Sequence, residues 1–149
     1  MIKKWIRLLC AATLILSLTA CAHELGSGLG SDVISKPEEY RHIYEAKERI
    51  ILKSIAGVLR EKKIGDNVSV DYRLNTIDSD YVISDEWRIK TNARVRRLNW
   101  KECEVSLVVR TEKKTKTGWE LRRLLGKDQY DNIFSVIDLK IYEEMAKVE

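Results

Sequence analysis

Hydrophobic residues recur at steps of three and four in two parts of the chain, which predicts two amphipathic helices. The first would cover residues 35–63, because Ser35 and Glu38 have the spacing of a capping box and Gly65 follows a basic last turn. Its hydrophobic stripe is Ile43, Ala46, Ile50, Ile51, Ile55, Val58 and Leu59. The second would start with Asp128 as N-cap and carries Tyr130, Ile133, Phe134, Val136, Ile137, Ile141 and Met145.

Between these helices hydrophobic and polar residues alternate, as they do in half-buried strands. We expect strands over residues 68–74, 87–96, 103–110 and 119–124, with turns over residues 75–80 and 112–118. The order of elements is then α-β-β-β-β-α. It predicts an α+β domain over residues 35–149, in which two helices pack on one face of an antiparallel four-stranded sheet and the other face is mostly polar.

The two longest strands also predict their register. A hairpin centred on Asn99 pairs, on the inner face, Val95 with Cys103, Ala93 with Val105, Thr91 with Leu107 and Ile89 with Val109. The same register places Arg96 opposite Glu102 and Arg94 opposite Glu104 on the outer face. Opposite charges facing each other across a ladder contribute roughly 0.2–1 kcal/mol, and a slip by one residue would send both sets to the wrong face. This alternation directs Cys103 into the core.

The first 20 residues have the three-part layout of a secretory signal peptide. Lys3, Lys4 and Arg7 precede an uncharged run from Leu8 to Leu18, and small residues follow it. The run is shorter than the ~20 apolar residues that a membrane-spanning helix needs. Residues 22–34 are rich in glycine and small polar residues, which indicates a flexible tether with a span of roughly 20 Å.

Leu18-Thr19-Ala20-Cys21 resembles the lipobox of bacterial lipoprotein signals. The resemblance implies cleavage before Cys21, a lipid on the Cys21 thiol and a further acyl chain, such as palmitate, on the new amino group. Several acyl chains anchor a protein stably where one chain is marginal. Ala22, and not aspartate, follows the cysteine, which is similar to the pattern of Gram-negative lipoproteins sent to the outer membrane and implies a domain facing the periplasm. The alternative is an ordinary signal peptide with a coincidental cysteine.

Removal of this segment changes the charge and the cysteine content. Residues 1–20 hold three of the 27 basic residues and none of the 23 acidic ones, so the remainder has 24 basic residues, 23 acidic residues and a net charge of +1. That balance gives no reason to expect nucleic acid as a partner. Cys10 leaves with the signal and Cys21 carries lipid, so Cys103 has no cysteine left to pair with.

The search for catalytic residues gives no nucleophile–base set, and we expect neither an enzyme nor a cofactor. After the signal, the histidines are His23 in the tether and His42, four residues after Glu38 in the first predicted helix. A lone histidine there is more often a surface residue than a base or a metal ligand. Asp78, Asp80, Asp85 and Glu86 cluster around one predicted turn, but they lack the spacing and glycine of a calcium loop. We therefore expect no metal.

The outer-face basic row of Arg88, Lys90, Arg94 and Arg96 is the best candidate for binding. With Arg94 and Arg96 assigned to glutamate partners, the candidates are Arg88, Lys90 and Arg110, which could meet an anionic lipid headgroup or an acidic protein surface. The alternative is a solvated charged face.

Two of the tryptophans carry separate expectations. Trp87 alternates with polar residues and is expected in the core. Trp100, at the hairpin tip, is the fourth candidate binding residue, because an exposed aromatic side chain there suits a protein contact or a membrane interface. The other interpretation, which we favour slightly, folds the indole back over the sheet edge.

These observations favour a noncatalytic module of an envelope complex, held to the outer membrane by lipid on Cys21 and facing the periplasm. The lipobox, the tether and the helix-on-sheet order resemble small accessory lipoproteins of envelope assembly, including those of the β-barrel assembly machinery. The resemblance implies an envelope protein as partner and transfers no binding residue. The alternatives are a domain that holds a lipid or amphiphile between helices and sheet and, third, an enzyme.

Overall fold

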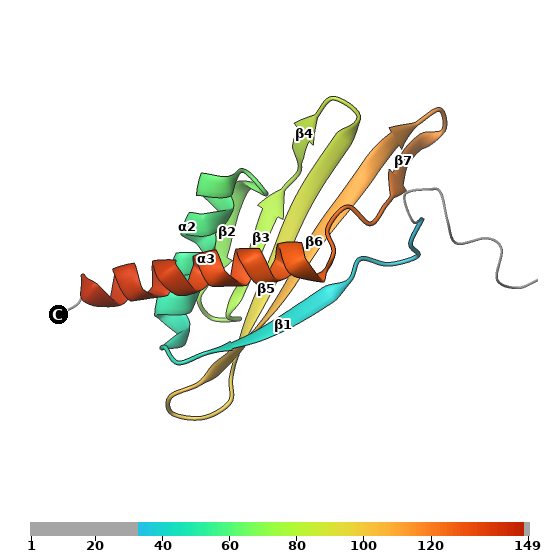
Figure 1. The fold of residues 1–149 in the computed structure, drawn as a ribbon. Coiled ribbons are helices and arrows are strands. Elements are labelled where there is room, and N and C mark those ends of the chain that lie inside the picture. The colour runs from blue at the N-terminus through green and yellow to red at the C-terminus, as the bar shows by residue number, and fades with distance from the viewer. Residues whose placement is uncertain (1–32, 148–149) are drawn as a thin grey trace, which may run out of the picture. The chain divides into compact units, whose positions relative to one another are not determined.

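The computed structural model describes residues 33–147 as an antiparallel sheet of seven strands with two helices (Figure 1). The strands are β1 (Glu39–Tyr44), β2 (Asp66–Asp71), β3 (Thr76–Asp80), β4 (Val82–Ser84), β5 (Trp87–Arg97), β6 (Cys103–Thr115) and β7 (Gly118–Leu121). The helices are α2 (Glu48–Lys62) and α3 (Lys127–Ala146). The signal segment, the lipobox with Cys21, His23 and most of the tether lie outside the described residues. Neither helix is long and apolar enough to cross a membrane.

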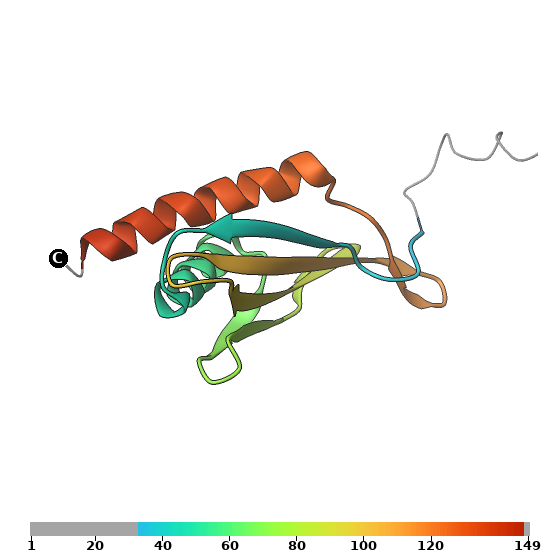
Figure 2. The same ribbon diagram turned by 90° about the horizontal axis from the view of Figure 1, so that it is seen from below.

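The strands follow the order β1-β6-β5-β3-β2, with β4 paired to β5 and β7 paired to β6. Helix α2 packs against β2, β3 and β5, and α3 packs against α2 and β1. Figure 2 shows the long α3 lying along one side of the twisted sheet. The predicted α+β class is confirmed, but the sheet has seven strands and not four.

The prediction that residues 35–63 form one helix is wrong for its first part. Residues 39–44 are strand β1, which pairs with β6 from Glu39↔Val108 to Tyr44↔Cys103. The ring of Tyr40 stacks on Tyr130 with centroids 4.1 Å apart, and the Tyr44 hydroxyl donates to the Phe134 carbonyl oxygen at 2.8 Å. These long-range contacts favour the extended conformation over the local helical pattern.

Helix α2 consequently starts at Glu48 and not at the predicted capping box of Ser35 and Glu38. It ends at Lys62, and Lys63 takes the left-handed conformation with φ 54°. Gly65 serves a different purpose from the predicted helix stop. A Cβ atom at this position would lie 2.6 Å from the side chain of Ser79, so the absence of a side chain allows the close approach of β3.

Two segments predicted as turns belong to strands. Residues 76–80 form β3 because Ile77 and Ser79 point into the core, where they are 1% and 3% exposed. The true turn precedes β3: the Asp71 carboxylate accepts from the backbone N–H groups of Arg73 and Leu74. Residues 112–115 continue β6, which then turns back into β7.

The predicted hairpin register is displaced by two residues. In the structure Val95 lies opposite Val105 and Arg96 lies opposite Glu104. The loop holds this register because Asn99 Oδ1 accepts from the backbone N–H groups of Lys101 and Glu102, at 2.8 and 2.9 Å. A shift by two residues preserves the alternation of faces. For this reason the predicted inner face is correct although every predicted pair is wrong.

The core lies between the helices and the sheet and contains 20 buried hydrophobic residues among those described. Cys103 is buried at 2% exposure, as predicted, and its thiol donates to the Ala46 carbonyl oxygen at 3.3 Å. The predicted stripe of α3 is confirmed for Tyr130, Phe134, Ile137 and Ile141, all buried. The predicted N-cap is wrong. Gly126 precedes the helix, and its backbone N–H donates to Gln129 Oε1 at 2.9 Å.

Candidate functional site

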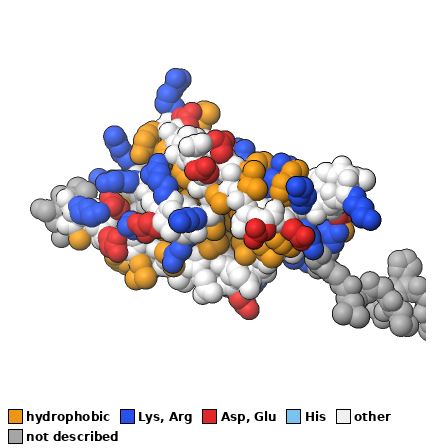
Figure 3. Space-filling model, turned by 90° about the horizontal axis from the view of Figure 1, so that it is seen from above, with side chains coloured by type: hydrophobic (Ala, Val, Ile, Leu, Met, Phe, Trp, Pro, Cys, Tyr) orange, Lys and Arg blue, Asp and Glu red, His pale blue; other side chains and the backbone are white. Residues whose placement is uncertain are grey.

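The predicted basic row lies on the face of the sheet away from the helices, and ion pairs neutralise most of it. Arg96 contacts Glu104 at 2.9 Å, and Lys90 lies 3.8 Å from Asp78. The candidates Arg88 and Arg110 both contact a single carboxylate, that of Glu112. Elsewhere on the surface, in the view from above in Figure 3, Lys and Arg side chains are likewise interspersed with Asp and Glu side chains. This row therefore does not form a broad surface of one charge sign.

Glu112 is a buried carboxylate that sequence reasoning missed by placing it in a solvated turn. It is 2% exposed, and it accepts hydrogen bonds from Arg88, from Arg110 Nε at 2.5 Å and from the Tyr81 hydroxyl at 3.1 Å. The Arg88 guanidinium lies between two aromatic rings, 4.3 Å from that of Tyr81 and 4.7 Å from that of Trp119. The sequence signals for Glu112 are its even spacing from Glu104 along β6 and the position of Arg110 two residues before it.

The electrostatics of this cluster indicate a structural role. Burial raises the pKa of Glu112, but the hydrogen bonds from Arg110, Arg88 and Tyr81 outweigh it and hold that pKa below its ordinary value. Burial together with the bond to Glu112 raises the pKa of Tyr81. With Glu112 ionised and Tyr81 protonated, Arg88 and Arg110 are committed to an internal partner. Arg88 and Arg110 are therefore not available as binding residues for an external partner.

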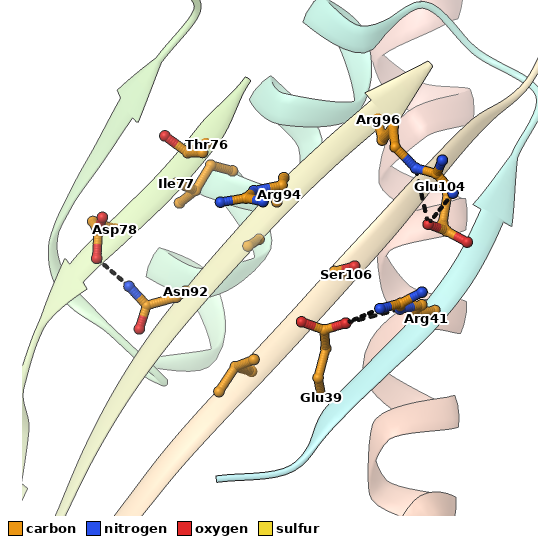
Figure 4. A pocket seen from close by; sticks show the side chains of 12 residues that line it. Glu39, Arg41, Thr76, Ile77, Asp78, Asn92, Arg94, Arg96, Glu104 and Ser106 are labelled. Atoms are coloured by element: carbon orange, nitrogen blue, oxygen red, sulfur yellow. Dashed lines mark hydrogen bonds and ion pairs between the residues drawn. The ribbon is translucent and has the colours of Figure 1, made fainter. Parts of the chain in front are cut away.

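A polar hollow of about 570 Å³ lies over the same face, nearer the hairpin tip (Figure 4). One ladder row crosses it from β1 to β3: Arg41 is the Cα partner of Ser106, Ser106 of Arg94, and Arg94 of Thr76. Ion pairs flank the row, Arg41 with Glu39 at 2.7 Å on one side and Arg96 with Glu104 on the other. The small side chain of Ser106 leaves the space open between them.

A second surface, the Trp100 groove, lies where the β5–β6 hairpin tip meets the start of α2 and the end of α3. It measures about 660 Å³ and is lined by Glu45, Ala46, Lys47, Arg49, Ile50, Lys53, Trp100, Lys101, Glu144 and Met145. Trp100 is 85% exposed, so the expectation that it folds back over the sheet edge is wrong. The Asn99 turn places the indole at the tip, where its ring lies 4.7 Å from Lys101 Nζ.

Charge in the Trp100 groove is predominantly basic. Four lining side chains are basic and two are acidic. Of the acidic pair, Glu144 already contacts Lys53 at 2.5 Å and Lys147 at 2.6 Å, and the bonds from Lys147 and Lys53 lower its pKa to about 2. The guanidinium carbon of Arg49 lies 5.4 Å from the centroid of the Tyr72 ring. The groove thus combines an exposed indole with a cationic rim.

His42 and Trp87 both lie in environments that differ from their predicted ones. His42 lies on β1 and not on a helix, and its ring stacks on Phe134 with centroids 5.2 Å apart. Trp87 is half-buried and not in the core, with Lys113 Nζ 5.8 Å from its ring.

The predicted acidic cluster is divided between two elements. Asp78 and Asp80 lie on β3, and Asp85 and Glu86 form the β4–β5 turn. Within residues 33–147, no three His, Cys, Asp or Glu side chains come together in a way that could hold a metal ion.

Comparison with known proteins adds a distant structural likeness. No protein-family model matches the sequence, and a search of curated proteins likewise found no match. Among solved structures, a TBP-like protein from Parabacteroides distasonis is similar, with 12% sequence identity and a TM-score of 0.42 over 75% of this chain and 97% of that chain. At this degree of similarity the neighbour says nothing about function.

Proposed function

We propose that this protein is an accessory lipoprotein without catalytic activity, held at the periplasmic side of the outer membrane by lipid on Cys21, and that it docks onto an envelope protein through the Trp100 groove. The observation that carries the docking proposal is the indole at the hairpin tip, 85% exposed beside apolar and basic side chains. The lipobox sequence supports the anchor.

An exposed tryptophan in this position is a good anchor for a protein contact. A tryptophan buries about 150–250 Å² on full burial, and at about 25 cal/mol per Å² this corresponds to roughly 4–6 kcal/mol of hydrophobic free energy. Most of that free energy is still available, because the indole remains in water. Tryptophan is enriched among the residues that dominate binding energy at interfaces. Ala46, Ile50 and Met145 extend the apolar surface next to it.

The rim defines the chemistry of the partner. Lys47, Arg49 and Lys101 border the apolar part of the groove, and Lys53 contacts Glu144. A complementary segment would carry an apolar side chain for the contact with Trp100 and acidic side chains on either side. Such charge complementarity speeds association and selects the correct partner.

The alternative of an amphiphile between helices and sheet has less support. It needs a concave apolar cavity at that place. The same space holds the buried hydrophobic residues of the core, with Ile51, Leu52, Ile55, Leu107 and Ile137 each 0% exposed. A co-purified amphiphile in native mass spectra of the full-length protein would revive this alternative.

Site-specific photo-crosslinking in intact cells tests the docking proposal. A photoreactive phenylalanine derivative replaces Trp100 in one strain and Tyr142 in another. Tyr142 is the matched control because it is an aromatic residue of α3, 64% exposed and not part of the groove lining. We expect one discrete envelope protein to be captured at position 100 and not at 142, and capture to fall when Lys47→Glu and Lys101→Glu reverse the rim. Equal capture at both positions, or capture that ignores the charge reversal, contradicts the proposal.

A further inference from the structure

On the open face of the sheet, Arg94 differs from the cations around it. Its neighbours Arg41, Arg96 and Lys90 each contact a carboxylate: Glu39 at 2.7 Å, Glu104 at 2.9 Å and Asp78 at 3.8 Å, respectively. Within residues 33–147, the structure gives Arg94 no such contact, and its side chain is exposed. Figure 4 shows it extending over the sheet towards β3, while the two ion pairs with Glu39 and Glu104 lie on the other side.

Residues with neutral hydrogen-bonding side chains lie next to Arg94 on both neighbouring strands. Thr76 on β3 and Ser106 on β6 are the two ladder partners of Arg94, and both line the same hollow. Adjacent strands lie about 4.8 Å apart, so Thr76 and Ser106 stand one strand spacing to either side of Arg94 and border the space that a ligand bound to Arg94 would occupy. The ladders of β3, β5 and β6 fix their relative positions.

We propose that Arg94 binds the carboxylate of a ligand in this hollow and that the hydroxyl groups of Thr76 and Ser106 contact other polar atoms of the same ligand. The guanidinium presents a planar fork of N–H donors that matches the two oxygens of a carboxylate. The ligand carries a single negative charge, because Arg41 is paired with Glu39, Arg96 with Glu104, and Lys90 from outside the lining with Asp78, which, among the residues that the structure describes, leaves Arg94 as the cation without a carboxylate partner. Glu39, Glu104 and Asp78 would repel a phosphate monoester, with a charge of about −1.5 to −2, more strongly than a carboxylate.

Binding of small anions to the full-length protein in nonionic detergent tests this site. The probes are N-acetylglycine as the carboxylate, N-acetylglycinamide as its neutral counterpart and inorganic phosphate as the dianion. Binding of each probe is measured from the NMR chemical shifts of the protein at constant ionic strength. We expect saturable shifts of Thr76, Arg94 and Ser106 with N-acetylglycine and none with the amide. Arg94→Gln should weaken binding about tenfold or more, and Thr76→Val or Ser106→Ala about two- to tenfold. Arg94→Lys keeps the charge but not the planar fork of donors, so its affinity should lie between those of the parent and of Arg94→Gln.

Lys116→Gln is the matched control, since it removes one positive charge in the β6–β7 turn, outside the lining of the hollow. It should leave binding unchanged, and unaltered thermal unfolding of the Arg94 variants would show that they fold. The proposal is overturned if N-acetylglycine causes no saturable shifts, if the amide or phosphate binds as well, or if Lys116→Gln weakens binding as much as Arg94→Gln. A ligand bound here leaves the Trp100 groove free, so failure of either proposal leaves the other in place.

Discussion

Replacing Glu112 with alanine should destabilise the domain by about 3 kcal/mol, the lower end of the cost of removing one partner from a buried ion pair. The carboxylate is 2% exposed and accepts hydrogen bonds from Arg88, Arg110 and Tyr81. Its loss leaves two guanidinium groups side by side without a counter-ion. The lower end applies because the side chains of Arg88 and Arg110 are 26% and 45% exposed, so water can partly replace the lost carboxylate.

Denaturant unfolding of the parent protein and three variants measures this cost. Glu112→Gln keeps the shape of the side chain but not its charge, so its effect should be smaller than that of Glu112→Ala. Glu86→Gln is the control: this glutamate is 71% exposed and lies 3.9 Å from Lys113, and its replacement should change little. For a domain of this size the alanine variant should also unfold about 10 °C lower. A loss below about 1 kcal/mol for Glu112→Ala, or one equal to that of Glu86→Gln, would refute the reasoning.

Further predictions concern pH, the core and the anchor. Because the pKa of Glu112 is lowered in the folded state, its stabilisation is complete above the ordinary glutamate pKa and is lost as pH falls through the folded value. Unfolding free energies measured from neutral to acidic pH should therefore drop less steeply for Glu112→Gln than for the parent. Leu107→Ala, at a residue that is 0% exposed, should cost roughly 2–5 kcal/mol in the same denaturant assay. Tyr130→Phe should cost about 1–3 kcal/mol, since it leaves the Val109 N–H, now bonded to the Tyr130 hydroxyl at 2.9 Å, without a partner; an unchanged midpoint would contradict this role. Cys21→Ala should move the protein from the membrane to the soluble fraction, and continued retention in membrane pellets would count against a lipid anchor.

The spacing of hydrophobic residues predicts correctly those helices and strands that depend mainly on contacts between residues close in the sequence. The alternation along β5 and β6 and four of the seven residues predicted for the α3 stripe are correct because side-chain periodicity directly records which face is buried. Met145, the last residue of that stripe, is 39% exposed. The register of that hairpin was wrong by two residues because alternation has a period of two and cannot distinguish such shifts. The missing information lay in the loop, where Asn99 holds the turn around Trp100.

Segments whose structure depends on distant partners were misassigned. Residues 39–44 continue the helical spacing of α2, yet they form β1 because β6 offers a strand edge on one side and Tyr130 and Phe134 offer aromatic surfaces above. Thr76–Asp80 is polar enough to resemble a turn, but its pairing with β2 and β5 and the burial of Ile77 and Ser79 make it a strand. In both segments tertiary contacts outweighed local propensity.

The sequence by itself determined the α+β class, the faces of the long strands and of α3, and the lipobox on which the proposed anchor rests. The tertiary structure decided which charged and aromatic side chains remain available to bind a ligand or a partner. Arg88 and Arg110, chosen from the sequence as binding residues, hold the buried Glu112, whereas Arg94 and Trp100 remain accessible. The physical reason is that a charge is neutralised, or an aromatic ring is buried, by whatever the fold places within a few ångströms of it. Arg88 and Glu112 are 24 residues apart in the sequence, and no local periodicity reveals their contact.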